Sequence, residues 1–380
     1  LDFTGNISKM NDKKDERIIT VSYTSENLSF AGAAKLKVQG TSSLKYAKKN
    51  YTINFYEDSS LEDKMKVDVG WGKQSKYCIK ANWIDKKHAR NVVSARLAAE
   101  MQAKYGLLEN TPHNGTVDGF PVEIYSNGEF LGIYTFNIPK DAWLFNMDED
   151  NPDHLVFCGE KWAAANYFNA DPDYDSWAIE IGEENEYSMS RLRKLFDFIR
   201  FSTDEEFVED FEKHLSLDST LNYFIFMELA YLSDNRGKNM LLVTYDGEKW
   251  YPSLYDLDSS WGTDWQGTGL ENYKTSKLNF STNILWARLM SLFGDEIAER
   301  YAQLRSDILS KENILDKFNS FTGSIPAVSF EKEAAKWGQK IPGYPVSQIE
   351  EYLDYMLPYL DAKYGFNVPS EDSGNAPQDS

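Results

Sequence analysis

The sequence contains few of the residues that most often bind metals or cross-link a chain. Among its 380 residues there are 2 cysteines and 4 histidines, and neither H-E-x-x-H nor C-x-x-C occurs. These features argue against a zinc site and against a disulfide framework. We therefore expect Cys78 and Cys158 to be two buried thiols.

Long apolar runs and one common phosphate-binding loop are also missing. No stretch of about 18 apolar residues occurs, so we expect no membrane-spanning helix. The pattern G-x-x-x-x-G-K-[ST] is absent, which excludes a Walker-type nucleotide site. The first residue is Leu1 rather than Met, which fits a processed or trimmed chain and a removed signal peptide.

Positive charge is scarce in this chain. The sequence has 40 Lys and Arg residues against 60 Asp and Glu residues, a net charge of -20. Nucleic acid or an anionic membrane would be repelled at long range, so we expect neither as a partner. A basic substrate would be attracted instead.

The remaining composition is typical of a globular protein, with 42% apolar and 14% aromatic residues. Alternating apolar residues predict strands at 17–29, 35–40 and 49–56 and a hairpin over 121–137. Helical periodicity predicts helices at 88–105, 188–201, 204–215, 218–232, 283–309, 330–338 and 347–364.

These elements predict an α+β protein. We expect a β-rich N-terminal lobe, a connector, a mainly helical C-terminal lobe that carries one hairpin, and a disordered tail or linker. Their bounds are 1–137, 138–150, 151–367 and 368–380. A protein kinase has the same order of a sheet lobe, a hinge and a helical lobe.

The segment from Asp234 to Asp258 is the most informative part of the chain. It begins S-D-N-R-G-K-N, continues as two apolar runs joined by D-G, and ends in D-L-D. The runs and their turn predict a hairpin that brings Asn239 and Asp256 side by side. Protein kinases use the same residue types for phosphoryl transfer: one Asp takes the proton of the acceptor, while an Asn and a second Asp bind magnesium.

We therefore predict a phosphoryl-transfer site. Asp234 would be the base, and Asn239 and Asp256 the magnesium ligands. Asp258 is a candidate further ligand, because residues two apart on an extended segment face the same way. The alternative is a helix-ending loop in which Asp, Asn and Gly serve backbone geometry, with Asp258 capping the next loop.

The groups that hold the phosphates are expected in the N-terminal half. Strand parity places Lys49 on the apolar face of the strand at 49–56 and Lys48 on the solvent face, which favours Lys49 as the phosphate lysine. A lysine that reaches out to solvent is the alternative. Arg90 begins a predicted helix, where phosphate binds well, or is a simple surface arginine. The small polar turn with Ser42 and Ser43 would cover the phosphates.

Several segments, in chain order, resemble the CotH family, the spore coat protein H-type atypical kinases. They are Gln39-Gly40-x-Ser42-Ser43 with Lys48-Lys49-Asn50-Tyr51, Asn82-x-x-Asp85 with Arg90-Asn91, Gly132-x-Tyr134, Asp234 with Asn239, Tyr255-Asp256-Leu257-Asp258 with Trp261-Gly262, and Tyr352-Leu353 with Tyr359-Leu360. The sequence departs from the family at Gln39, where arginine is usual, and near Asn137, where glutamate is usual.

The resemblance implies a protein-kinase-like fold, ATP with Mg²⁺ or Mn²⁺, and a Ser-rich protein acceptor outside the cytoplasm or on a spore surface, and the net charge of the chain favours a basic one. It also makes Asp234 and Asp256 the two essential aspartates. We expect the strand end and hinge at Asn137 and Lys140 to bind adenine. The predicted function is that of an atypical secreted protein kinase that transfers the γ-phosphate of ATP to Ser or Thr of an extracellular or surface protein. The alternative is a non-catalytic kinase-like module that binds a surface protein or a glycan.

Overall fold

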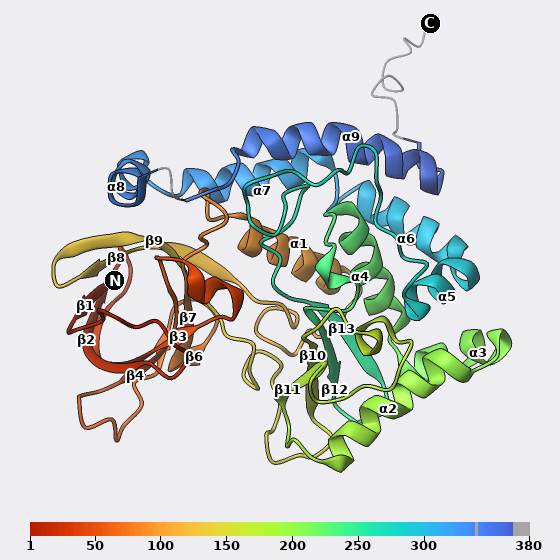
Figure 1. The fold of residues 1–380 in the computed structure, drawn as a ribbon, viewed down its shortest axis with the longest axis horizontal. Coiled ribbons are helices and arrows are strands. Elements are labelled where there is room, and N and C mark those ends of the chain that lie inside the picture. Colours follow the sequence, from red (N-terminus) through yellow and green to blue (C-terminus); the bar gives the residue numbers. More distant parts are fainter. Residues whose placement is uncertain (339–340, 368–380) are drawn as a thin grey trace, which may run out of the picture.

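The computed structural model describes residues 1–338 and 341–367, which form two parts (Figure 1). The N-terminal part is a β-barrel, and the C-terminal part packs helices around a small sheet. The α+β class, with a β-rich N-terminal half and a helical C-terminal half, is therefore confirmed. The tail predicted at 368–380 lies outside the described residues.

Seven strands close the barrel in the order β1-β2-β3-β4-β7-β9-β8. Neighbouring strands are antiparallel except β1 and β8, whose parallel pairing completes the ring. The barrel strands are β1 Asp2–Thr4, β2 Glu16–Thr24, β3 Ser29–Gln39, β4 Asn50–Tyr56, β7 Lys76–Lys80, β8 Gly119–Ser126 and β9 Glu129–Asn137, and a separate pair is β5 Val67–Asp68 with β6 Lys73–Gln74. The predicted hairpin over 121–137 is confirmed as β8 and β9.

Alternation along the strands separates the barrel interior from its outer face. In β4, Tyr51, Ile53 and Phe55 are buried, whereas the residues between them are partly exposed. Aromatic rings fill much of the interior, and the ring centroids of Tyr77 and Phe136 lie 4.6 Å apart. This packing fixes the register of the strands, and with it the position of every polar side chain on the outer face.

The C-terminal part is built on a four-stranded sheet in the order β11-β10-β12-β13. Its strands are β10 Leu155–Gly159, β11 Trp177–Ile181, β12 Met240–Thr244 and β13 Trp250–Leu254. The predicted hairpin is confirmed as β12 and β13, with Met240 opposite Leu254. The expectation of a lone hairpin is wrong, because β10 and β11 extend it. All five residues of β10 are buried, so that strand has no alternating pattern.

Nine helices occur in the described residues. They are α1 Arg90–Lys104, α2 Glu186–Phe201, α3 Asp204–His214, α4 Leu217–Leu229, α5 Ile284–Leu292, α6 Gly294–Arg305, α7 Lys311–Gly323, α8 Ala327–Trp337 and α9 Val346–Tyr364. The single helix predicted at 283–309 is wrong, because Phe293 ends α5 and the chain restarts as α6. No helix in the described ranges is long and apolar enough to cross a membrane.

Helix α8 comes late in the chain and packs against the barrel beside β9 (Figure 1). Its Glu333 accepts hydrogen bonds from Lys48 Nζ at 2.7 Å and from the Ile133 backbone N–H at 3.0 Å. His88 Nε2 lies 2.7 Å from the same carboxylate. The prediction that Lys48 faces solvent is therefore wrong. Since β4 begins only at Asn50, strand parity does not extend to Lys48.

Candidate functional site

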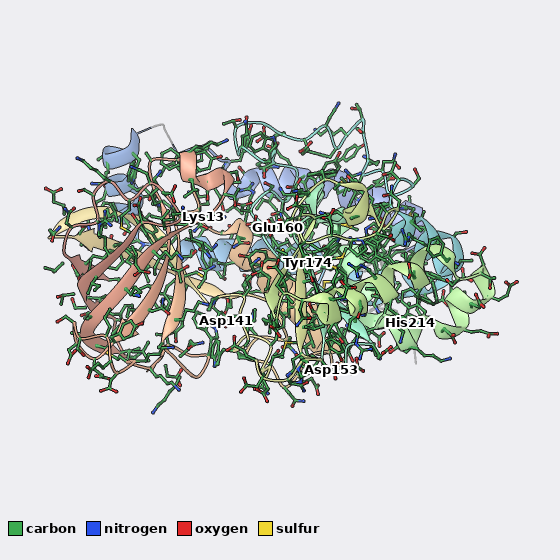
Figure 2. The ribbon with its side chains drawn as sticks, turned by 60° about the horizontal axis from the view of Figure 1, so that its bottom comes forward. Lys13, Asp141, Asp153, Glu160, Tyr174 and His214 are labelled. Carbon is green, nitrogen blue, oxygen red and sulfur yellow. The ribbon has the colours of Figure 1, made fainter. Side chains whose placement is uncertain are left out.

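A cleft of about 660 Å³ lies between the barrel and the helical part. Lys13 and Glu160, both labelled in Figure 2, line it from the barrel side and from the end of β10. Its acidic lining residues are Asp234, Asp256, Asp258, Glu160 and Glu180, and its basic lining residues are Lys13, Lys80, Lys140 and Lys238. The cleft therefore combines carboxylates and amines in one space.

The loop that follows α4 carries Asp234 and is held by hydrogen bonds to α4, to the end of β13 and to β10. Tyr223 of α4 donates its hydroxyl to the Asn235 carbonyl at 2.7 Å. The Asn235 side chain in turn donates to the Tyr255 carbonyl at 2.9 Å, which links the loop to the end of β13. The loop ends where the Asn239 N–H donates to the Gly159 carbonyl of β10 at 2.7 Å. Asp234 is thus presented by a loop with fixed backbone positions.

The same loop approaches β10 too closely for larger residues. A Cβ on Gly159 would lie 2.0 Å from the Gly237 carbonyl oxygen, and a Cβ on Gly237 would lie 2.0 Å from the Asn166 carbonyl oxygen. These contacts are shorter than any normal van der Waals distance, so both positions require glycine. The glycine in the S-D-N-R-G-K-N run therefore serves the packing of the loop.

Asn239 and Asp256 flank the paired ends of the hairpin. Asn239 precedes Met240 and Asp256 follows Leu254 by two positions, and those two strand residues are direct partners. Both Asn239 and Asp256 adopt left-handed backbone conformations, with φ of 61° and 58°. Asn and Asp tolerate this region better than most side chains. The hairpin therefore delivers an amide and a carboxylate to the floor of the cleft.

The segment beyond β13 is fixed by helix α1. The Leu257 N–H donates to the Asn91 side chain at 2.9 Å, which anchors the D-L-D run at the start of α1. Asp256 is exposed and Asp258 is half-buried, and both line the cleft. The two carboxylates therefore share the cleft, but the prediction of an extended segment is wrong, because Asp256 has a φ of 58°.

The three aspartates of the cleft differ in their partners. The Asp234 carboxylate pairs with Lys238 Nζ at 2.6 Å and accepts from Trp162 Nε1 at 3.2 Å. In the described ranges, no basic side chain lies within 4.0 Å of Asp256 or Asp258. Burial, and then the neighbouring Asp256, raise the pKa of Asp258 to about 8. A bound cation would favour the ionised form of Asp258, which burial and the neighbouring Asp256 disfavour.

The donor chemistry of this floor fits a hard divalent ion. Mg²⁺ and Mn²⁺ prefer oxygen ligands, and one or two carboxylates with an amide oxygen are typical. Asn239, Asp256 and Asp258 offer such a set. The fit rests on these oxygen donors and on the missing cationic partners of the two carboxylates.

A second group of ligand-type atoms lies in the same cleft and fits a metal less well. Atoms of Cys158, Glu160 and Glu180 lie within 4.8 Å of one another. Burial raises the pKa of the Cys158 thiol to about 12, so it is not a thiolate at neutral pH. Glu180 already pairs with Lys140. Both cysteines are buried, as predicted, and the structure shows that they are not bonded to one another.

The structure does not bring Lys49 or Arg90 to the cleft. Lys49 Nζ donates to the Leu44 carbonyl at 2.5 Å. Arg90 is buried, where its guanidinium lies 3.2 Å from Asp85 and donates to Gln348 of α9 at 2.6 Å. Lys49 therefore stabilises the connection between β3 and β4, and Arg90 joins the start of α1 to α9.

Lys80 lines the cleft in their place, and no sequence pattern had singled it out. It ends β7, in which Tyr77 and Ile79 face the barrel core with no exposed surface. Burial alone lowers the pKa of the Lys80 amine, but Tyr255 and, more weakly, Asp256 raise it, and the net pKa lies above the usual value. Lys80 lies on the face of β7 opposite Tyr77 and Ile79, so the parity argument that favoured Lys49, which sought an amine on the apolar face, would not have found it.

The remaining predicted residues lie at the edges of the cleft. Ser42 and Ser43 line it as part of a short 3-10 helix that follows Gly40. Gly40 has a φ of 114°, and a Cβ there would lie 1.9 Å from Ser43 Oγ. Lys140 also lines the cleft, whereas Asn137 is buried and lines a small adjoining cavity that it shares with Lys140.

The predicted site residues all lie within the part of the chain that matches a known protein family. A family model described as CotH kinase protein matches residues 36–366, which span the barrel strands from β3 onward and both walls of the cleft. A search of curated proteins finds no match to the chain.

Proposed function

Because the chain belongs to the CotH kinase family, we propose that it is an atypical secreted protein kinase that transfers the γ-phosphate of ATP to Ser or Thr of an extracellular or surface protein. The observation that carries this proposal is the convergence of Asp234, Asn239 and Asp256 with Lys80 in one cleft. Phosphoryl transfer needs this combination of a base, metal ligands and a phosphate-binding cation.

The proposed base is Asp234. Its carboxylate accepts the proton of the acceptor hydroxyl while that oxygen forms a bond to the γ-phosphorus and the bond to the β–γ bridging oxygen breaks, which releases ADP. The contacts from Lys238 and Trp162 fix the orientation of this carboxylate. Lys238, whose amine lies 2.6 Å from this carboxylate, would balance negative charge beside it.

Asn239 and Asp256 would hold Mg²⁺ or Mn²⁺, with Asp258 as the further ligand. When bound, the metal neutralises negative charge on the phosphates. Lys80 orients the phosphate oxygens from the opposite wall, and the turn with Ser42 and Ser43 closes over them. We assign adenine to the end of the cleft next to Asn137 and Lys140.

The order of elements supports a kinase-like arrangement. In protein kinases a glycine-containing loop covers the phosphates, a later strand carries the lysine, and a helix follows that strand. Here Gly40 lies between β3 and β4, Lys80 ends β7, and α1 comes next. One difference is that α1 places Asn91, not a glutamate, in the cavity beside Lys80.

The test is transfer from radiolabelled ATP to a basic, Ser-rich protein with Mg²⁺ or Mn²⁺. We expect the wild type to label the acceptor and Asp234→Ala to lose nearly all of that activity. Asp316→Ala is the matched control, because Asp316 is exposed on α7, far from the cleft in sequence and outside its lining. If the wild type and Asp234→Ala transfer equally little label, the proposal fails.

One observation favours a second candidate, a non-catalytic module that binds a surface protein or a glycan. Trp162 and Trp265 line the cleft with 48% and 54% of their surfaces exposed. Exposed aromatic rings at a cavity are common in binding sites. Thermal unfolding separates the two candidates, because a ligand that binds the folded state raises the melting temperature. Stabilisation by glycans without stabilisation by ATP and Mn²⁺ would favour the second candidate.

A further inference from the structure

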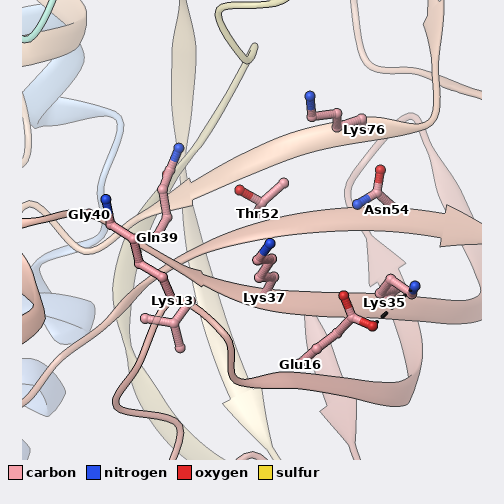
Figure 3. Close-up of a pocket in the computed structure, with 10 residues that line it drawn as sticks. Lys13, Glu16, Lys35, Lys37, Gln39, Gly40, Thr52, Asn54 and Lys76 are labelled. Atoms are coloured by element: carbon pink, nitrogen blue, oxygen red, sulfur yellow. Dashed lines mark ion pairs between the residues drawn. The ribbon is translucent and has the colours of Figure 1, made fainter. Parts of the chain in front are cut away.

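A second cavity, of about 510 Å³, lies on the outer face of the barrel (Figure 3). We call it the lysine pocket, after the four lysines that line it, Lys13, Lys35, Lys37 and Lys76. Glu16 is the one acidic residue of its lining. The whole chain carries a net charge of -20, so the charge of this pocket is opposite in sign to that of the molecule.

The strands of the barrel fix the lysines in place. Lys35 of β3 is paired in register with Asn54 of β4, and Asn54 is paired with Lys76 of β7. Lys37 lies opposite Thr52 in the same way. Amines and neutral hydrogen-bonding groups therefore alternate across three adjacent strands, on a surface whose backbone is rigid.

Half of this positive charge has no acidic partner. Lys35 pairs with Glu16 at 3.1 Å and Lys76 with Asp141 at 3.2 Å. Lys37 is exposed, and in residues 1–338 and 341–367 no carboxylate lies within 4.0 Å of its amine. Lys13 donates to Thr41 Oγ1 at 3.0 Å and likewise lacks an acidic partner in these ranges. Two amines are therefore available to an external anion.

The lysine pocket is continuous with the cleft. Lys13, Gln39 and Gly40 line both cavities. Gly40 begins the turn that we assign to the phosphates of ATP. A peptide that lies in the lysine pocket can therefore pass over these three residues and reach the cleft within a few extended residues, each about 3.3 Å long.

We propose that the lysine pocket docks an anionic segment of the acceptor protein whose hydroxyl group enters the cleft. This inference rests on the proposed function. The recognised chemistry is an anionic oxygen, which Asp and Glu carboxylates or phosphoserine can supply. In a Ser-rich acceptor, earlier rounds of transfer would create phosphoserines, so the product of one round would bind the enzyme better in the next. The acidic cleft and the basic pocket together select an acceptor with both signs of charge.

The experiment is fluorescence anisotropy of short labelled peptides without nucleotide. Three peptides share one sequence around a serine and differ only in a flanking segment, which is neutral, rich in Asp and Glu, or phosphoserine-containing. We expect both anionic peptides to bind the wild type about tenfold more tightly than the neutral one, and 0.5 M salt to remove most of this difference. A tighter complex with the phosphoserine peptide identifies phosphoserine as the preferred source of the anion.

The variant that tests the site is Lys13→Ala combined with Lys37→Ala. We expect it to weaken binding of the anionic peptides about fivefold to tenfold and to leave the neutral peptide unchanged. The matched control is Lys66→Ala combined with Lys86→Ala, which removes the same charge from two exposed lysines outside both cavities. The control should stay within about twofold of the wild type. Unfolding curves of both variants establish that they are folded.

Three results overturn the docking proposal. The first is equal binding of the anionic and neutral peptides, and the second is equal losses in the two double variants. The third is a single-stranded oligonucleotide of the same charge that binds as tightly as the anionic peptides, because the pocket would then be a nonspecific polyanion site. Transfer from ATP to the neutral peptide is measured separately. If transfer occurs and docking fails, only the docking proposal is wrong; if docking succeeds without any transfer, the proposed function is wrong.

Discussion

The two walls of the cleft are built in different ways. The C-terminal wall takes its three aspartates and its amide from one stretch of chain, Asp234 to Asp258, built around one hairpin. The barrel wall takes Gly40 from the turn after β3 and Lys80 from the end of β7, and α8 packs against it from outside. The chemistry of the first wall therefore depends on local backbone geometry, whereas that of the second depends on strand register and long-range packing.

The largest expected effect comes from the base on the C-terminal wall. Asp234→Asn keeps the size of the side chain but removes the proton acceptor, so kcat should fall by about 10²–10⁴-fold. The KM for ATP should change little, because the carboxylate is assigned to the acceptor and not to the nucleotide. Steady-state kinetics that give kcat and the KM for ATP separately check this prediction, with Asp316→Asn as the control. An equal rise in the KM for ATP would place Asp234 on the nucleotide instead.

The second prediction compares two lysines of the barrel wall. Lys80→Ala should lower kcat/KM for ATP about 100-fold, because it removes a charged group from the cleft. Lys49→Ala should stay within about threefold, because its amine bonds only the Leu44 carbonyl among the described residues. Measuring kcat/KM for ATP in both variants shows which lysine binds the phosphates. The reverse order of effects would restore Lys49 as the phosphate lysine.

These two predictions also mark how far the sequence reaches. Asp234, Asn239 and Asp256 could be expected in one place because a hairpin turn and two apolar runs set their relation locally. The cation on the facing wall could not, because parity was applied to a strand whose first residue, Asn50, lies beyond both Lys48 and Lys49. Which lysine lines the cleft depends on where β4 begins and on how β7 pairs with it, and these are tertiary properties.

Strand β10 and helix α7 were not predicted, and they differ in the signal that their sequences carry. Strand β10 is buried along its whole length, so it shows neither alternation nor a polar face. Helix α7 did carry a signal, with Ile314, Phe318 and Phe321 buried at helical spacing. The burial of Lys48 gave no local signal at all, because its partner Glu333 lies far away in the chain.

The third prediction concerns the support of the barrel wall. Burial raises the pKa of Glu333, but the opposite effect of His88 and then Lys48 is larger, so the pKa falls to about 2. Its ordinary pKa is 4.5, so the ionised form stabilises the folded state fully above pH 4.5, and this stabilisation is lost as the pH falls towards 2. Glu333→Gln should therefore lower the free energy of unfolding by about 3 kcal/mol at pH 7.

Urea unfolding of the wild type and Glu333→Gln at several pH values measures this difference. We expect the gap between them to narrow between pH 4.5 and pH 2. Glu331→Gln is the matched control, because Glu331 is exposed on the same helix. A gap that is constant over this range would mean that the carboxylate is not held ionised by its neighbours.

The smallest effect is expected at the turn between β3 and β4. Gly40→Ala forces an alanine into a φ of 114° and against Ser43 Oγ, so the turn must shift at a cost of about 1–3 kcal/mol. We expect the KM for ATP to rise about fivefold to tenfold, with kcat nearly unchanged. Gly128→Ala, a positive-φ glycine with open space around it, is the control for backbone strain alone. Equal KM values for the two variants would remove the turn from the nucleotide site.

The most direct test of the central claim is calorimetric titration of ATP into the wild type and Asp256→Asn, each with Mn²⁺ or with a chelator. If the hairpin floor holds the metal under the nucleotide, the wild type will bind ATP at least about tenfold more tightly with Mn²⁺. Asp256→Asn will lose this metal-dependent gain. ATP binding that is the same with metal and with chelator, or a gain that survives in Asp256→Asn, would contradict the account.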